Sequence, residues 1–389
     1  MGNGSQFMVF RSNNALKFFV KCVSFLFMSC ISFIEISCTS DNNYQGKLRY
    51  FDETNEEMIL HSDTLYTNGI YTPFINVVDS AVLFYNISQG DFTFKASNLS
   101  TGQAIGDFCP IGHGHNEFIS LSPIQQIYLE DEKSKTLLFA PNESKILIWN
   151  ITESFKTGST IYDYIGGYSW KDKSPVSYSK QVMINNDSIL LYTPSIRTFP
   201  DDKITDPTYQ IRTLGSNILI REIRVFNHAI DNKDSQILPE SYLDASFSLK
   251  PDKTKFVEAM NWLPQINIVD LKSGKILGNR MKDKQDEDIF STNMEKALFC
   301  YNRVVSDNDY IYALWVGTPR SEMRSGIGYN TIHIFDWEGR FIKKIRIEYP
   351  VNELTINIQN EELYGWNIEK QRLFKFDLNS LKNIIMTHK

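Results

Sequence analysis

The stretch Thr331-Ile-His-Ile-Phe-Asp336-Trp-Glu-Gly339-Arg340-Phe-Ile-Lys-Lys-Ile-Arg-Ile347 contains two apolar runs with a turn signal between them. Apolar residues alternate with polar ones in both runs at close to a period of two, which is typical of strands with one buried face. Asp336 suits the first position of a tight turn, and Gly339 supplies the positive φ that a bulged hairpin needs. The stretch therefore predicts a β-hairpin.

Weaker copies of the first half of this hairpin, which we call the signature strand, recur along the chain. Each copy is an alternating apolar run that ends in Asn or Asp, and the copies are Phe92–Asn98, Lys145–Asn150, Glu222–Asn227, Ile266–Asp270 and Arg372–Asp377. Together with the first stretch, successive copies lie 41 to 77 residues apart, near the length of one propeller blade with its loops. Two more apolar segments precede most copies, as Gln126–Glu130 and Lys135–Phe139 precede the second.

Two leading strands, the signature strand and an outer strand after its turn make a four-stranded antiparallel blade. One such sheet cannot bury both faces, so each blade packs on the next, and closure into a ring leaves only short edges. We therefore predict an all-β fold over residues 47–389, a six-bladed β-propeller. Leu48–Phe51 is expected to close the ring by pairing beside the last blade, and helix signals are scarce.

Long spacings between copies indicate insertions at residues 194–209 and 317–329, which are rich in Pro, Gly and charge. Long loops on a rigid scaffold are common binding sites, although a solvated acidic loop is the plainer interpretation. Trp337 lies at a hairpin tip, where it either contacts a partner or packs between blades. The candidate ligand-binding residues are Asp201, Asp202, Asp206, Arg320 and Trp337.

Residues 1–38 have the pattern of an export signal. Lys17 and Lys21 precede a 13-residue apolar run, which is shorter than the roughly 20 residues that span a bilayer. The following Glu35-Ile-Ser-Cys38 resembles a bacterial lipobox, although the pattern has an apolar residue in place of Glu35. We therefore expect a lipid on Cys38 and a tether over residues 39–46. Lipidation at Cys30, ordinary cleavage and an uncleaved anchor are the alternatives.

Charge and cysteine content narrow the class of protein further. The chain carries a formal net charge of −6, and residues 1–38 contribute +2, so the remainder carries −8. A mildly acidic body without a basic run argues against nucleic acid as a partner. Beyond Cys38 only Cys109 and Cys300 remain, and no Cys/His metal spacing occurs. We expect two buried free thiols, with a disulfide as the alternative.

Residues 111–118 resemble the Gly-Arg-Gly-Pro-Gly-Glu-Phe stretch of TolB-like six-bladed propeller lipoproteins of Gram-negative bacteria. The matching residues are Gly112, Gly114, Glu117 and Phe118, and the departures are His113, His115 and Asn116. The run from Ile332 to Leu378 is similar to the last two blades of that family. The resemblance implies the fold and an envelope location, periplasmic or at the cell surface. It implies little chemistry, because the family is largely without an assigned activity.

The same stretch contains His113-x-His115-x-Glu117. Alternate residues of an extended chain share one face, so two imidazoles and a carboxylate there are a candidate site for one divalent metal ion. The alternative is a glycine turn with exposed histidines, in which Glu117 binds backbone. The resemblance favours this alternative, because the family pattern has no histidine at either position.

No local catalytic motif occurs, such as Gly-x-Ser-x-Gly or His-Glu-x-x-His. This is weak evidence, since propeller enzymes collect their residues from several blades. We expect a lipid-anchored, non-catalytic binding or scaffold module without a cofactor, with a protein, peptide or glycan as its ligand. The alternative is an enzyme of the lactonase or glycan-active type with a metal in the central channel, an analogy that rests on the fold alone.

Overall fold

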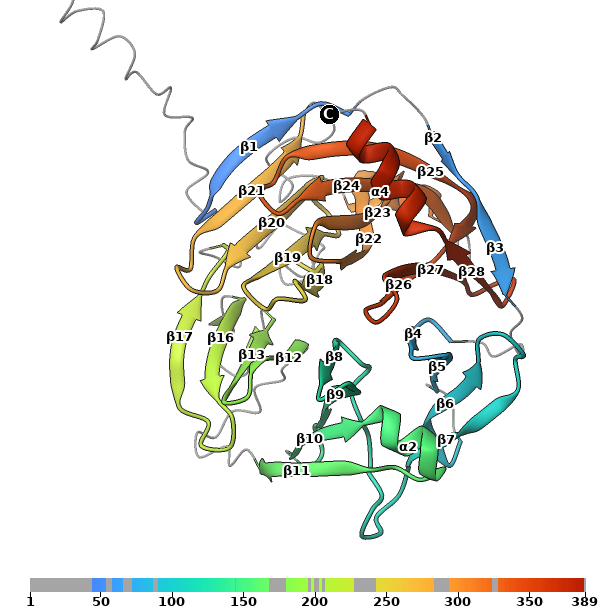
Figure 1. Cartoon of the computed structure of the whole chain (residues 1–389). Coiled ribbons are helices and arrows are strands. Elements are labelled where there is room, and N and C mark those ends of the chain that lie inside the picture. Colours follow the sequence, from blue (N-terminus) through green and yellow to red (C-terminus); the bar gives the residue numbers. More distant parts are fainter. Residues whose placement is uncertain are drawn as a thin grey trace, which may run out of the picture. The chain divides into compact units, whose positions relative to one another are not determined.

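The structure is a computed structural model that describes residues 44–53, 58–65, 72–86, 90–143, 145–167, 180–194, 197–198, 203–204, 207–226, 243–282, 294–323 and 328–387. Residues 45–389 form one compact unit. Six sheets are arranged around a central axis (Figure 1), each built on four consecutive antiparallel positions, and a two-stranded sheet lies beside them in sequence. The prediction of an all-β, six-bladed propeller is confirmed.

The blades are numbered in chain order, with the strand nearest the axis first. Blade 1 contains β4 (Ile75–Val78), β5 (Ala81–Tyr85), β6 (Phe92–Asn98) and β7 (Ala104–Pro110). Blade 2 contains β8 (Ile127–Glu130), β9 (Lys133–Ala140), β10 (Lys145–Asn150) and β11 (Tyr162–Gly167). Blade 3 contains β12 (Lys180–Asn185), β13 (Ser188–Thr193), β16 (Thr208–Thr213) and β17 (Leu219–Ile223). The short pair β14 (Arg197–Thr198) and β15 (Lys203–Ile204) lies between β13 and β16 in sequence.

The second half of the ring includes strands from the start of the unit. Blade 4 contains β18 (Ala245–Leu249), β19 (Lys255–Met260), β20 (Gln265–Asp270), β21 (Ile276–Met281) and, outermost, β1 (Lys47–Phe51). Blade 5 contains β22 (Leu298–Ser306), β23 (Tyr310–Pro319), β24 (Tyr329–Asp336), β25 (Phe341–Val351) and β2 (Met58–Leu60). Blade 6 contains β26 (Glu353–Asn357), β27 (Glu362–Asn367), β28 (Arg372–Phe376) and β3 (Ser62–Leu65).

Five of the six signature strands are the third strands of their blades, namely β6, β10, β20, β24 and β28. The prediction for Glu222–Asn227 is wrong, because the third strand of blade 3 is β16. The outermost strand β17 ends at Ile223, inside the predicted segment. A period of two marks a half-buried strand but does not distinguish a third strand from a fourth.

Each of these five strands is followed by a turn or helix whose backbone donors are bound by the Asn or Asp at the strand end. Its side-chain oxygen accepts hydrogen bonds from backbone N–H groups just ahead, as Asp336 Oδ1 does from Arg340 N at 2.8 Å and Asp270 Oδ1 from Ser273 N at 2.6 Å. Asn150 instead caps the short helix α2 (Ile151–Thr157) by accepting from Glu153 N. The polar end residue thus satisfies the backbone donors of the following turn or helix.

The ring is closed by a strand from the start of the unit, as expected, but the segment differs from the prediction. Antiparallel pairing with β28 comes from β3, whereas Leu48–Phe51 lies in β1, parallel to β21 of blade 4. The short β2 runs parallel to β25 of blade 5. The strands β1, β2 and β3, which we call the N-terminal belt, therefore lie at the outer edges of blades 4, 5 and 6 (Figure 1).

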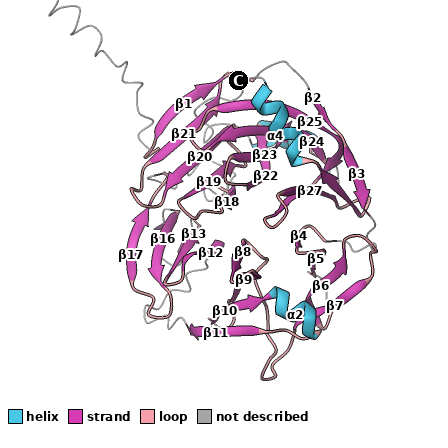
Figure 2. Cartoon of the chain, viewed as in Figure 1, coloured by secondary structure: helices cyan, strands magenta, loops and turns pink. Residues whose placement is uncertain are grey.

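A helix occupies the position after β28 where an outer strand was predicted. Helix α4 (Leu378–Thr387) is one of the helices in Figure 2. It begins after Asp377, whose Oδ1 accepts from Asn379 N at 2.9 Å. Because the chain turns into α4, the outer position of blade 6 is left for β3. Among the described residues, no helix combines the length and the apolar character needed to cross a membrane.

The core consists of aromatic and aliphatic side chains between neighbouring blades. Trp366 of blade 6 packs on Phe84 of blade 1, and Phe94 of blade 1 stacks on Trp149 of blade 2 at 5.1 Å between ring centroids. Cys109 and Cys300 are buried free thiols, so that prediction is confirmed. Because each interface joins two blades, no blade buries its core alone.

Candidate functional site, an axial cavity

A cavity of about 320 Å³ lies on the propeller axis. Its lining comes from the first strands of five blades, β4, β8, β18, β22 and β26, and from the turns that follow three of them. The described lining residues include amides, hydroxyls, aliphatic side chains and the two cations Lys253 and Arg303, and none of them is Asp, Glu or His. The cavity is thus a polar site assembled from distant parts of the sequence.

One wall of the cavity contains two polar side chains that form no hydrogen bond with any other described residue. Asn76 of β4 is half-buried and Thr355 of β26 is 5% exposed, and neither side chain has a hydrogen-bond partner within the described chain. Gln126 is different, because its amide bonds both backbone groups of Met183 in the next blade. Asn76 and Thr355 are therefore available to a ligand, whereas Gln126 joins two blades.

The wall across the axis is formed by Lys253 and Tyr128. Lys253 lies in the β18–β19 turn of blade 4, and its ammonium nitrogen is 4.7 Å from the centroid of the Tyr128 ring in blade 2. This cation–π contact passes the intervening blade 3 and connects two sides of the cavity. Burial lowers the pKa of Lys253, and the charge of Glu130 opposes that shift.

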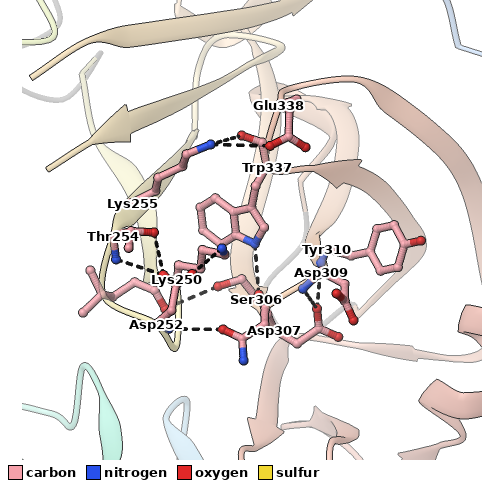
Figure 3. A network of polar contacts seen from close by, with 12 residues as sticks. Lys250, Asp252, Thr254, Lys255, Ser306, Asp307, Asp309, Tyr310, Trp337 and Glu338 are labelled. Atoms are coloured by element: carbon pink, nitrogen blue, oxygen red, sulfur yellow. Dashed lines mark hydrogen bonds and ion pairs between the residues drawn. The ribbon is translucent and has the colours of Figure 1, made fainter. Parts of the chain in front are cut away.

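Hydrogen bonds hold the turn that carries Lys253 in place (Figure 3). Asp252 Oδ1 accepts from Thr254 N at 2.9 Å and from Thr254 Oγ1 at 2.6 Å. Asp252 N donates to Asn308 Oδ1 of blade 5 at 3.1 Å. The turn is therefore fixed to the next blade, and the position of Lys253 does not depend on its own contacts.

Trp337 takes part in the same network and is buried, at 3% exposure. Its Nε1 donates to Asp307 O at 3.0 Å, and Lys255 Nζ donates to the Trp337 carbonyl at 2.9 Å (Figure 3). Of the two interpretations given above for Trp337, the structure shows packing between blades, and the side chain does not line the cavity. The indole turns inward between blades 4 and 5, where its N–H finds a partner.

The second cation of the lining has a counterion. Arg303 Nε of β22 lies 2.5 Å from Glu353 Oε1 of β26, and the exposed fractions of the two side chains are 19% and 7%. Burial raises the pKa of Glu353 to about 7, against the opposing effect of Arg303. This pair joins the inner strands of blades 5 and 6.

The structure places His113, His115 and Glu117 in the arrangement given above as the alternative to a metal site. Both histidines are exposed, and Glu117 Oε2 accepts from Gly114 N at 2.8 Å. A Cβ on Gly112 would lie 2.0 Å from Glu117 Oε2, so that glycine leaves room for the carboxylate. Within the described ranges no three His, Cys, Asp or Glu side chains are grouped to hold a metal.

The remaining candidates lie apart from the cavity lining or outside the described residues. Arg320 is exposed, at the start of a short 3₁₀ helix, and its guanidinium carbon is 5.9 Å from the Trp262 ring centroid. Asp201, Asp202, Asp206 and Cys38 lie outside the described residues. The cavity residues were missed because they share no local motif. A polar residue within the first, axis-facing strand of a blade is the sequence feature that could have indicated them.

Comparisons with known proteins identify the fold and no family. No family model and no curated protein matches the chain. A presumed exported protein from Bacteroides fragilis has a similar structure, with 12% identity, a TM-score of 0.50 and coverage of 85% of this chain and 99% of that one. The calcium-binding protein regucalcin from Agrobacterium tumefaciens has 11% identity, a TM-score of 0.44 and coverage of 82% and 94%. A luciferin-regenerating enzyme has 9% identity, a TM-score of 0.42 and coverage of 81% and 90%.

Proposed function

We propose that this chain is a non-catalytic binding module of the bacterial cell envelope, which takes a peptide, protein segment or glycan into its axial cavity. The observation that carries the proposal is the cavity wall formed by Asn76 and Thr355. Their polar atoms lack partners within the described chain and line a cavity at the propeller axis. Unsatisfied polar groups in a concave site are costly unless a ligand or water binds them.

The composition of the lining favours binding over catalysis. Metal-dependent hydrolysis needs carboxylate, imidazole or thiolate ligands, and acid–base catalysis needs a titrating group near the reacting bond. The described lining contains none of these three kinds of metal ligand, and its titratable side chains are Lys253, Arg303 and Tyr128. Amides and hydroxyls, by contrast, are the usual groups for orienting a polar ligand.

A ligand screen with two cavity variants tests this function. Purified protein is titrated calorimetrically with a panel of soluble oligosaccharides and short peptides. For the ligand that binds, Asn76→Leu and Thr355→Val are each expected to weaken affinity about tenfold, because each removes about one hydrogen bond.

The matched control is Thr64→Val, the same substitution on the exposed strand β3 of blade 6. It should leave affinity unchanged. Equal affinity for wild type and both cavity variants, or turnover of the bound molecule, would contradict the proposal.

The envelope location rests on the pattern of residues 1–38, in which a positive segment and a short apolar run precede Cys38. Metabolic labelling with a radioactive or clickable fatty acid is expected to mark wild type and Cys30→Ala, and to leave Cys38→Ala unlabelled. The chemical reason is that a lipobox cysteine supplies the thiol that carries the lipid. Equal labelling of wild type and Cys38→Ala would exclude lipidation at this position.

A further inference from the structure

The Lys253 ammonium lacks a counterion in the described part of the chain. The ammonium makes neither an ion pair nor a hydrogen bond there, and its contact is a cation–π interaction with the Tyr128 ring. The carboxylate of nearby Glu130 is bound by Lys135 Nζ at 2.5 Å. Removal from water is costly for a charge, so a half-buried cation gains free energy from an anion that binds it.

The backbone conformation of Lys253 is fixed by the turn in which it lies. Its φ is +60°, in the left-handed region that side chains other than glycine rarely adopt. Such a conformation is unfavourable for a side chain other than glycine and persists where the surrounding contacts hold it. Here the hydrogen bonds of Asp252 to Thr254 and Asn308 determine it.

Of the two cations in the lining, Lys253 alone makes no ion pair within the described chain, and the charge of Glu130 acts on it without direct contact. Arg303 lies against Glu353, so its charge is largely compensated. The cavity therefore combines one cation that has no ion-pair partner in the described chain with the hydroxyl of Thr355 and the amide of Asn76. A ligand that complements these groups carries a negative charge and several groups that both donate and accept hydrogen bonds.

Resting on the binding function proposed above, we infer that the axial cavity binds a carboxylate-bearing sugar, whose carboxylate pairs with Lys253 and whose hydroxyls bond Asn76 and Thr355. Sugar hydroxyls both donate and accept, which suits an amide and a hydroxyl at once. The cavity volume is at the small end of the range of roughly 300–1,000 Å³ for small-molecule sites. That size suits one or two sugar rings better than an extended acidic peptide.

The test separates the charge of the ligand from its shape. Glucuronate, galacturonate and N-acetylneuraminate are titrated into the whole protein alongside their methyl esters, which keep the ring and remove the charge. At least one acid is expected to bind, and its ester at least tenfold more weakly. Lys253→Met should weaken binding of the acid by a similar factor and leave binding of the ester unchanged, since the charge pair is absent in both cases.

The control variant is Lys133→Met, which removes a lysine outside the cavity that pairs with Glu153. It should preserve affinity for the acid, and thermal unfolding should show that Lys253→Met is folded. Equal binding of acid and ester, or an acid affinity that Lys253→Met does not change, would overturn this inference and leave the binding function in place. Binding of tri-glutamate instead of any sugar would overturn the sugar class. Failure of these probes and of the whole oligosaccharide and peptide panel would overturn the binding function itself.

Discussion

Replacing Trp366 by alanine is expected to lower the free energy of unfolding by about 3–5 kcal/mol, the usual cost of truncating a fully buried tryptophan. The side chain is 0% exposed in β27 of blade 6. Its ring lies 5.5 Å from that of Phe84 in blade 1, and its Nε1 donates to Thr72 O at 2.8 Å. Since this interface joins the last blade to the first, the substitution weakens ring closure itself. Chemical denaturation followed by circular dichroism measures the loss.

Two variants show where that loss comes from. Trp366→Phe keeps an aromatic ring and leaves the Thr72 carbonyl without its donor, so we expect a smaller loss of about 1–3 kcal/mol. Trp262→Ala removes a tryptophan that is only partly buried and packs on Phe299, and it should cost less than Trp366→Ala. A loss for Trp366→Ala no larger than that for Trp262→Ala would contradict the role of this interface in closing the ring.

Replacing Arg303 by methionine is expected to destabilise the protein by about 3–5 kcal/mol at pH 8, because an unpaired buried carboxylate is left at Glu353. The effect should be much smaller at pH 5. Burial already raises the pKa of Glu353 to about 7 in the presence of Arg303, and loss of the cation raises it further. At pH 5 the folded variant therefore holds Glu353 in its neutral form. Urea unfolding at both pH values measures the difference.

The sign of this pH dependence follows from linkage. A carboxyl whose pKa is raised by folding contributes stability that is fully present below its ordinary value of 4.5 and is lost as the pH rises through its folded value. In the wild type this loss is on the order of 3 kcal/mol between pH 4.5 and 7. The variant Glu353→Gln should not show this loss of stability between pH 4.5 and 7. The double variant Arg303→Met, Glu353→Leu should be more stable at pH 8 than Arg303→Met alone. Equal destabilisation by Arg303→Met at pH 5 and pH 8 would contradict the raised pKa.

The blades were predictable because burial of one sheet face imposes a period of two. The runs that became β10, β20, β24 and β28 show this pattern and end in a polar capping residue. The third strand of blade 3 was missed because β16 carries only Tyr209 and Ile211 as buried apolar residues. The closing strand was misassigned because β3 is polar and partly exposed, so it resembles a loop.

The site was not predictable, because its residues meet only after the ring has closed. Asn76, Lys253 and Thr355 come from three different blades, and nothing in their sequence spacing relates them. The local His113-x-His115-x-Glu117 pattern has the residue types of a metal site, but the glycines beside it turn the chain so that Glu117 accepts a hydrogen bond from the backbone. A local motif reports chemistry reliably only when the local backbone holds its members together.

The N-terminal belt constrains when this protein can fold during biosynthesis. Lys47, Met58 and Leu65 pair with residues 277, 345 and 373. Each belt strand therefore pairs with a strand that is translated more than 200 residues later. Contacts of such long sequence separation form slowly, since the entropy of loop closure is lost before they stabilise the chain. The pairing of β3 with β28 therefore cannot form before residues 372–376 have been translated, so the first and last blades are joined late in synthesis.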